Sequence, residues 1–371
     1  MRRELERIEI PGEHEARERA WELVQAAFAE REPTPRRAPL VRPLLVAAAL
    51  VALLAAAFTP PGRAVIDSVR QAIGVEGAAE SLFSLPDGGQ VLVEAGSGAW
   101  VVSPDGGKRR LGDYREAAWS PFGRFVVASG PNELVALEPD GDVRWKLARR
   151  DVRFPRWGGS RVDTRIAYLT RGRLHVVGGN GEGDAAARAV PPPGPVAPAW
   201  RPGTSFVLAF VDTRGAVHAY DARTGAIRWS TTAFARPVLL EWSPDGSRLL
   251  VATRDRLVLF GAGGRRLSTE PLPGIVDASF SPGGLRLAVV REIAGQSELL
   301  VGGRRLFTGT GTFTNVRWSP DGRWLLVAWR EPDQWLFVSA SGSRPRRVRA
   351  AANVRSQFDT VGFPTISGWC C

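Results

Sequence analysis

The pentapeptide WSPDG decides the fold, and it occurs at Trp242–Gly246 and again at Trp318–Gly322. SRLLVAT follows the first copy and RWLLVAW follows the second. In each copy an aromatic residue ends one strand, and proline stops that strand because it cannot donate to the ladder. Asp-Gly then closes a tight turn, and the apolar run predicts a buried strand. Each copy therefore marks one strand–turn–strand unit.

Degenerate copies of this signature recur along the chain at spacings of 36, 38, 43, 42, 38 and 38 residues. The anchor aromatics are Phe83, Trp119, Trp157, Trp200, Trp242, Phe280 and Trp318. A period of about 40 residues with several short strands per unit is typical of a β-propeller, whose units stack because none covers its apolar faces alone. We expect an all-β, seven-bladed propeller over residues 81–371. The alternative is a six-bladed ring in which Phe83 belongs only to a leading strand.

The end of the chain carries one more strand-like segment, VGFPTISGW at Val361–Trp369. It ends in an aromatic residue but has no partner strands after it. We expect this segment to close the ring by pairing with the first blade near residue 90. The 41 Gly and 28 Pro of the chain suit the many turns of such a fold.

The aromatic-Ser-Pro-Asp-Gly signature followed by an apolar strand resembles the TolB-like, WD-repeat-like propeller repeat. The segments Leu137–Trp145 and Tyr220–Trp229 also resemble the quinoprotein-type repeat. The resemblance implies blade construction and, for TolB-like domains, protein docking on the flat faces. It brings no catalytic residue with it.

Residues 1–39 form a charged segment of a different kind. Residues 1–43 hold nine Arg and nine Glu, so this part is neutral. Glu13–Glu32 has helical apolar spacing and predicts an amphipathic helix that ends before Pro33. Its apolar face is the predicted contact for a cytoplasmic partner and contains Trp21, Leu23, Val24 and Phe28.

Leu44–Phe58 is an uninterrupted apolar run, LLVAAALVALLAAAF. It predicts a transmembrane helix over residues 40–60, followed by a membrane-proximal connector over 61–80. A cleaved signal peptide and a buried soluble helix are the alternatives. Four arginines precede the run closely, and Arg63 and Arg70 follow it. This bias predicts a single-pass plasma-membrane protein with a cytoplasmic N-terminus and an extracytoplasmic propeller.

The sequence lacks the residue patterns of common catalytic sites. It has three His, no Gly-x-Ser-x-Gly elbow, no Walker loop and no His-Glu-x-x-His. We therefore expect no catalytic residue, no cofactor and no metal site. The Gly-rich segment Gly178–Asp184 is predicted to be a flexible blade loop. Cys370 and Cys371 are open to several interpretations: exposed thiols, an intermolecular bridge, a packed strand end, or the adjacent-cysteine disulfide known in quinoprotein dehydrogenases.

The formal net charge of +11 lies entirely beyond residue 43. Only Lys108 and Lys146 are lysines, and an excess made almost wholly of arginine is weak support for nucleic-acid binding. On the predicted topology the basic propeller faces the cell envelope. The expected partners are therefore an anionic envelope polymer and not a nucleic acid. The densest basic cluster contains Arg344, Arg346, Arg347 and Arg349.

A short cytoplasmic helix, one span and an outer domain together resemble the architecture of membrane-anchored anti-sigma factors. That resemblance implies a binding or sensing module that signals to a cytoplasmic partner, with a sigma factor as the specific candidate. The zinc-binding His-x-x-x-Cys-x-x-Cys pattern of one such class is absent. The alternatives are a passive envelope scaffold for protein docking and a quinoprotein-type enzyme.

Overall fold

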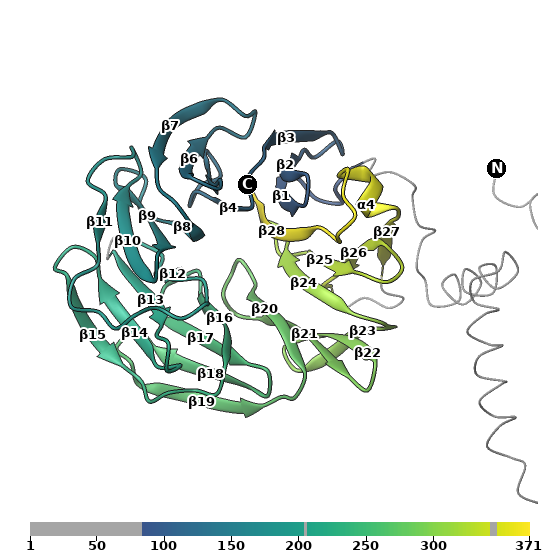
Figure 1. The fold of residues 1–371 in the computed structure, drawn as a ribbon. Coiled ribbons are helices and arrows are strands. Elements are labelled where there is room, and N and C mark those ends of the chain that lie inside the picture. Colours follow the sequence, from purple (N-terminus) through teal and green to yellow (C-terminus); the bar gives the residue numbers. More distant parts are fainter. Residues whose placement is uncertain (1–83, 204–205, 342–346) are drawn as a thin grey trace, which may run out of the picture. The chain divides into compact units, whose positions relative to one another are not determined.

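Seven four-stranded antiparallel sheets make up the computed structural model, which describes residues 84–203, 206–341 and 347–371. Figure 1 shows the sheets arranged around a centre as the blades of a propeller, and we name them A to G in chain order. The prediction of an all-β, seven-bladed propeller is confirmed, and the six-bladed alternative is wrong.

Blade A joins the two ends of the described chain. From the inside outward it contains β28 (Thr365–Cys370), β1 (Gln90–Ala95), β2 (Gly98–Val102) and β3 (Lys108–Gly112). Val91 pairs with Trp369 and Gln90 pairs with Cys370. The tail therefore closes the ring near residue 90, as the sequence predicts. The connector before β28 holds the short helix α4 (Val354–Gln357).

The other blades follow the chain from the inside outward. Blade B contains β4 (Glu116–Trp119), β5 (Val126–Ser129), β6 (Glu133–Leu137) and β7 (Val143–Ala148). Blade C contains β8 (Arg153–Gly159), β9 (Thr164–Thr170), β10 (Arg173–Gly178) and β11 (Ala185–Ala186). Blade D contains β12 (Ala199–Trp200), β13 (Val207–Val211), β14 (Val217–Asp221) and β15 (Ala226–Ser230).

Blade E contains β16 (Pro237–Trp242), β17 (Arg248–Thr253), β18 (Arg256–Gly261) and β19 (Arg266–Pro271). Blade F contains β20 (Ile275–Phe280), β21 (Leu287–Ile293), β22 (Gln296–Val301) and β23 (Arg304–Thr310). Blade G contains β24 (Phe313–Trp318), β25 (Trp324–Trp329), β26 (Gln334–Ser339) and β27 (Val348–Ala351). The innermost strands touch one another in the order β28, β4, β8, β12, β16, β20, β24 and back to β28.

The core lies between the blades. Strands such as β17 and β25, which follow the two WSPDG copies, are almost wholly buried, whereas the outer strand β19 is exposed along its full length. The apolar clusters contain residues of neighbouring blades, so each blade covers the face of the next.

The signature builds its own turn. In the copy at Trp242–Gly246 the Ser243 N–H donates to the Arg248 carbonyl at 2.8 Å, and the Arg248 N–H donates to Ser243 Oγ at 3.0 Å. Asp245 Oδ1 accepts the Ser247 N–H at 3.0 Å. Gly246 has a φ of 66°, in the left-handed region that glycine adopts without steric cost. Ser243, Asp245 and Gly246 therefore each stabilise the signature turn.

The Gly-rich segment Gly178–Asp184 is held by its neighbour in blade B. Trp145 Nε1 donates to the Gly179 carbonyl at 2.9 Å, and a Cβ on Gly181 would lie 2.8 Å from the Trp145 ring. Trp229 repeats this contact between blades D and E, donating to the Ala262 carbonyl at 2.9 Å. The segment is therefore a blade loop that packs against blade B, where Gly181 leaves room for the Trp145 indole.

Cys370 and Cys371 form a disulfide with each other, so the predictions of free thiols and of an intermolecular bridge are wrong. A Cβ on Gly123 would lie 2.5 Å from Cys371 Sγ and 2.8 Å from Cys370 Sγ. The disulfide therefore packs against the signature turn of blade B.

Several sequence predictions fall on residues outside the described part of the chain. These are the amphipathic helix, the Leu44–Phe58 run, the connector and Phe83. No helix among the described residues is long and apolar enough to cross a membrane.

Candidate functional site

The anchor aromatics of blades B to G stand on the innermost strands, and most of them end those strands. Three of them donate from the indole to the backbone of the preceding blade. Trp200 Nε1 donates to the Arg156 carbonyl at 2.9 Å, Trp242 Nε1 to Ala199 at 3.1 Å, and Trp318 Nε1 to Ser279 at 2.9 Å. In blade A the aromatic residue at the corresponding position is Trp369, the second-last residue of β28, and its Nε1 donates to the Gly88 carbonyl at 3.1 Å. The indoles of Trp200, Trp242 and Trp318 therefore join neighbouring blades.

A cluster of charged side chains, which we call the axial cluster, lies at the middle of the ring. Its members come from the innermost strands of five blades and from β1, and they interact electrostatically with one another. They are Glu94, Glu116, Arg156, Glu241, Asp277 and Arg317. The sequence analysis missed this cluster. For the five members on innermost strands, the available signal was a charged residue one or three positions before an anchor, on the side of the strand that faces the axis.

Arg317 and Asp277 form the tightest ion pair of the axial cluster. Arg317 Nη1 donates to Asp277 Oδ2 at 2.6 Å, with side chains 24% and 9% exposed. Burial alone would lower the pKa of Arg317, but the carboxylates of Asp277 and Glu241 outweigh burial and raise that pKa. Arg317 is therefore charged at neutral pH.

Arg156 is the second arginine of the axial cluster. Burial lowers the pKa of Arg156, while the nearby carboxyl groups of Glu94 and Glu116 oppose that shift. Burial raises the pKa of Glu94. Burial also raises the pKa of Glu241, to about 7. The cluster thus contains a carboxyl group that titrates near neutral pH.

Each carboxyl group of the axial cluster accepts a backbone N–H from the next blade. Glu94 accepts from Ala117 at 2.7 Å, Glu241 from Phe280 at 3.0 Å, and Asp277 from Val316 at 3.1 Å. Glu116 accepts from Phe154 in the same way. The carboxyl groups therefore hold the ring together.

The turns between the first and second strands of blades B to G lie on one face, which we call the signature-turn face. Phe122 and Val162 are in such turns of blades B and C, and they are 46% and 95% exposed. The Arg161 guanidinium lies 4.8 Å from the centroid of the Phe122 ring. Phe122, Arg161 and Val162 therefore form one exposed patch across two blades, which we call the turn patch.

Among the described residues no group of three His, Cys, Asp or Glu side chains is arranged to hold a metal ion. The predicted partner face at Trp21, Leu23, Val24 and Phe28 lies outside those residues, as do Arg344 and Arg346. Arg347 and Arg349 are described, and the Arg349 guanidinium lies 5.7 Å from the centroid of the Trp324 ring.

No family model and no curated protein matches this chain. Solved structures match its fold. KlHsv2, in a form whose loop 6CD is replaced by a Gly-Ser linker, has a TM-score of 0.53 at 10% identity, over 76% of this chain and 97% of that one. The Cps50 (Swd1) β-propeller domain of Myceliophteria thermophila has a TM-score of 0.51 at 16% identity, over 67% and 95%. A chain of the mitotic checkpoint complex has a TM-score of 0.50 at 17% identity, over 63% and 74%.

These matches and the seven sheets define the class: the chain contains a WD-repeat-like β-propeller. At such low identity the likeness extends to the fold alone.

Proposed function

We propose that this chain is a non-catalytic binding protein whose closed propeller recognises a protein partner. The observation that carries this proposal is the turn patch of Phe122, Arg161 and Val162. An aromatic ring, an arginine and an exposed aliphatic side chain are typical components of protein interfaces. The polar groups at the axis are occupied in joining the blades, which leaves the faces of the ring for recognition.

The finer form of the proposal places the propeller outside the plasma membrane, tethered by the Leu44–Phe58 run. Its support is the length of the apolar run and the excess of arginines before it. The predicted helical face with Trp21 and Phe28 then contacts a cytoplasmic partner, a sigma factor in the specific version. Its support is the resemblance in chain organisation to anti-sigma factors.

Site-specific photocrosslinking in cells tests the binding function. A photoreactive residue replaces Val162 in the full chain, and the matched control replaces Val361, which is 96% exposed and precedes β28. We expect a discrete protein adduct from position 162 that disappears when Phe122→Asp is added. Two results would contradict the proposal. One is that no adduct forms from position 162, and the other is that the adduct persists when Phe122→Asp is present.

The cytoplasmic and membrane parts need separate tests. A protease added to intact cells is expected to degrade the propeller and spare residues 1–39. A photoreactive residue at Trp21 in the full chain is expected to capture a sigma factor. Protection of the propeller would overturn the topology, and a deletion of 1–39 without any phenotype would favour the passive scaffold.

A further inference from the structure

A pocket of about 830 Å³ opens between blades B and C on the face opposite the signature turns. The connector after β7, the hairpin between β9 and β10 and the turn between β5 and β6 supply its walls. Its volume lies in the range of small-molecule sites, roughly 300–1,000 Å³. The side chains that matter here are Arg149, Arg150, Thr170, Arg171, Arg173 and His175.

Hydrogen bonds to backbone carbonyl groups hold the walls of this pocket in place. The Arg149 N–H donates to the Asn132 carbonyl at 2.9 Å. Thr170 Oγ1 donates to the Arg150 carbonyl at 2.6 Å. The connector that carries Arg149 and Arg150 is thereby bonded to a turn of its own blade and to a strand of the next. The pocket is preformed, so a ligand would not need to order it.

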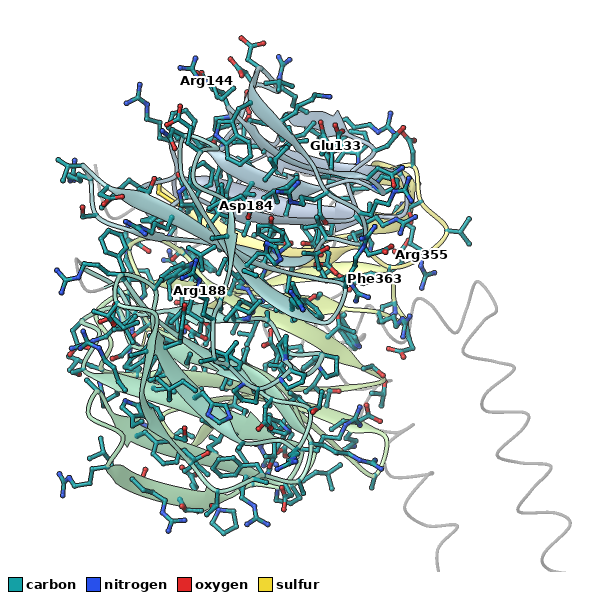
Figure 2. The ribbon with its side chains drawn as sticks, turned by 60° about the vertical axis from the view of Figure 1, so that its left-hand side comes forward. Glu133, Arg144, Asp184, Arg188, Arg355 and Phe363 are labelled. Atoms are coloured by element: carbon teal, nitrogen blue, oxygen red, sulfur yellow. A yellow bond between two sulfur atoms is a disulfide. The ribbon has the colours of Figure 1, made fainter. Side chains whose placement is uncertain are left out.

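Asp184, labelled in Figure 2, contacts two of the side chains that line the pocket, Arg149 and His175. Its side chain is 6% exposed and accepts from Arg149 Nε at 2.8 Å and from the Tyr168 hydroxyl at 2.7 Å, while His175 Nδ1 lies 3.3 Å away. Burial alone would raise the pKa of Asp184, but these hydrogen bonds outweigh burial and lower it. Asp184 is therefore ionised and neutralises Arg149.

The remaining arginines of the pocket have no such partner. Within the described part of the chain, the guanidinium groups of Arg150, Arg171 and Arg173 form no ion pair and no hydrogen bond. Three uncompensated positive charges on one preformed pocket repel one another, and a bound anion removes that repulsion. The planar guanidinium fork binds phosphoryl oxygens with two parallel hydrogen bonds.

We propose that this pocket binds a compact anion with two or more phosphoryl groups. The pocket is too large for one phosphate to reach all of its walls, and three unpaired guanidinium groups match a ligand whose charge is distributed over several groups. The same chemistry occurs in a free polyphosphate and in a phosphorylated lipid headgroup.

Titration calorimetry of the full chain in detergent, with sodium tripolyphosphate at low salt, tests this proposal. The test variant carries Arg150→Ser, Arg171→Ser and Arg173→Ser. The matched control carries Arg265→Ser, Arg266→Ser and Arg304→Ser, which removes the same charge from exposed arginines of blades E and F. We expect the wild type and the control to bind equally and the test variant to bind at least tenfold more weakly, with an unchanged circular-dichroism melting curve in both variants.

Two results would overturn the proposal: a wild type that does not bind tripolyphosphate, or an equal loss of affinity in both variants. Orthophosphate is expected to bind at least tenfold more weakly than tripolyphosphate, and equal binding would reject a ligand with several phosphoryl groups. Sedimentation with vesicles that contain cardiolipin, whose headgroup carries two phosphates, distinguishes the sources. If the wild type sediments with the vesicles and the test variant does not, the ligand is a lipid headgroup. If both sediment equally, the pocket binds a soluble ligand.

Discussion

The guanidinium of Arg286 in blade F lies 4.8 Å from the centroid of the Trp318 ring in blade G. The same guanidinium donates to the Gly322 carbonyl and to the Ala340 carbonyl, each at 3.0 Å. Arg248 repeats the arrangement one junction earlier, 5.7 Å over Phe280. An arginine just after one signature turn therefore binds the aromatic anchor of the next blade, and the two motif positions are coupled around the ring.

Arg286→Ala is expected to lower the free energy of unfolding by about 1–2 kcal/mol, because it removes a cation–π contact and two hydrogen bonds to carbonyls. Urea unfolding followed by tryptophan fluorescence measures the loss. Arg304→Ala is the control, since Arg304 is exposed and begins an outer strand. Equal midpoints for the two variants would contradict this prediction.

Trp318→Phe is expected to cost about 1 kcal/mol more than Trp157→Phe. Both indoles are buried, at 5% and 8% exposure, so both variants lose similar volume. Trp318 Nε1 donates to Ser279, whereas Trp157 Nε1 has no partner in the described structure. The urea midpoints of the two variants measure this difference. A larger loss of stability in Trp157→Phe than in Trp318→Phe would show that the interblade hydrogen bond is unimportant.

Gly158→Ala is expected to destabilise the propeller by about 1–3 kcal/mol, because a Cβ there would lie 2.2 Å from Trp200 Cγ in the next blade. Gly263→Ala is the matched control, since a Cβ at that position meets nothing within 4 Å. We expect the control to remain within about 0.5 kcal/mol of the wild type. Thermal melts of the two variants provide the comparison, and coincident curves would refute the close packing.

The free energy of unfolding is expected to fall as the pH rises from about 4.5 to about 7. Burial raises the pKa of Glu241 from 4.5 to about 7, so in this range the folded state holds a proton that the unfolded state has released. The loss is about 2–3 kcal/mol for a shift of this size. Because Glu94 is shifted in the same direction, it adds to the slope.

Glu241→Gln keeps an acceptor for the Phe280 N–H but does not titrate, so its stability is expected to change less over this pH range. Glu270→Gln, at an exposed position of β19, is the control and should keep the wild-type slope. Urea unfolding at intervals between pH 4.5 and 8 gives the three slopes. A Glu241→Gln slope equal to that of the wild type would assign the pH dependence to other groups.

The sequence by itself determined the repeat, the propeller class and the closure of the ring, whereas the structure decided between six and seven blades. These features depend on local chemistry that spacing reveals, namely an aromatic strand end, a proline stop, a glycine turn such as Gly246 and an apolar strand such as β17. The tail at Val361–Trp369 was recognisable because one more strand of the same type had no partner after it.

Only the tertiary structure decided which distant groups meet. Glu94, Arg156 and Arg317 look like ordinary charged strand residues, and a closed ring alone brings them to one axis. Arg150 and Arg173 share a pocket because the connector of one blade packs against a hairpin of the next. Spacing along the chain encodes the repeated contacts within and between blades, whereas a site between blades depends on side chains that differ from one repeat to the next.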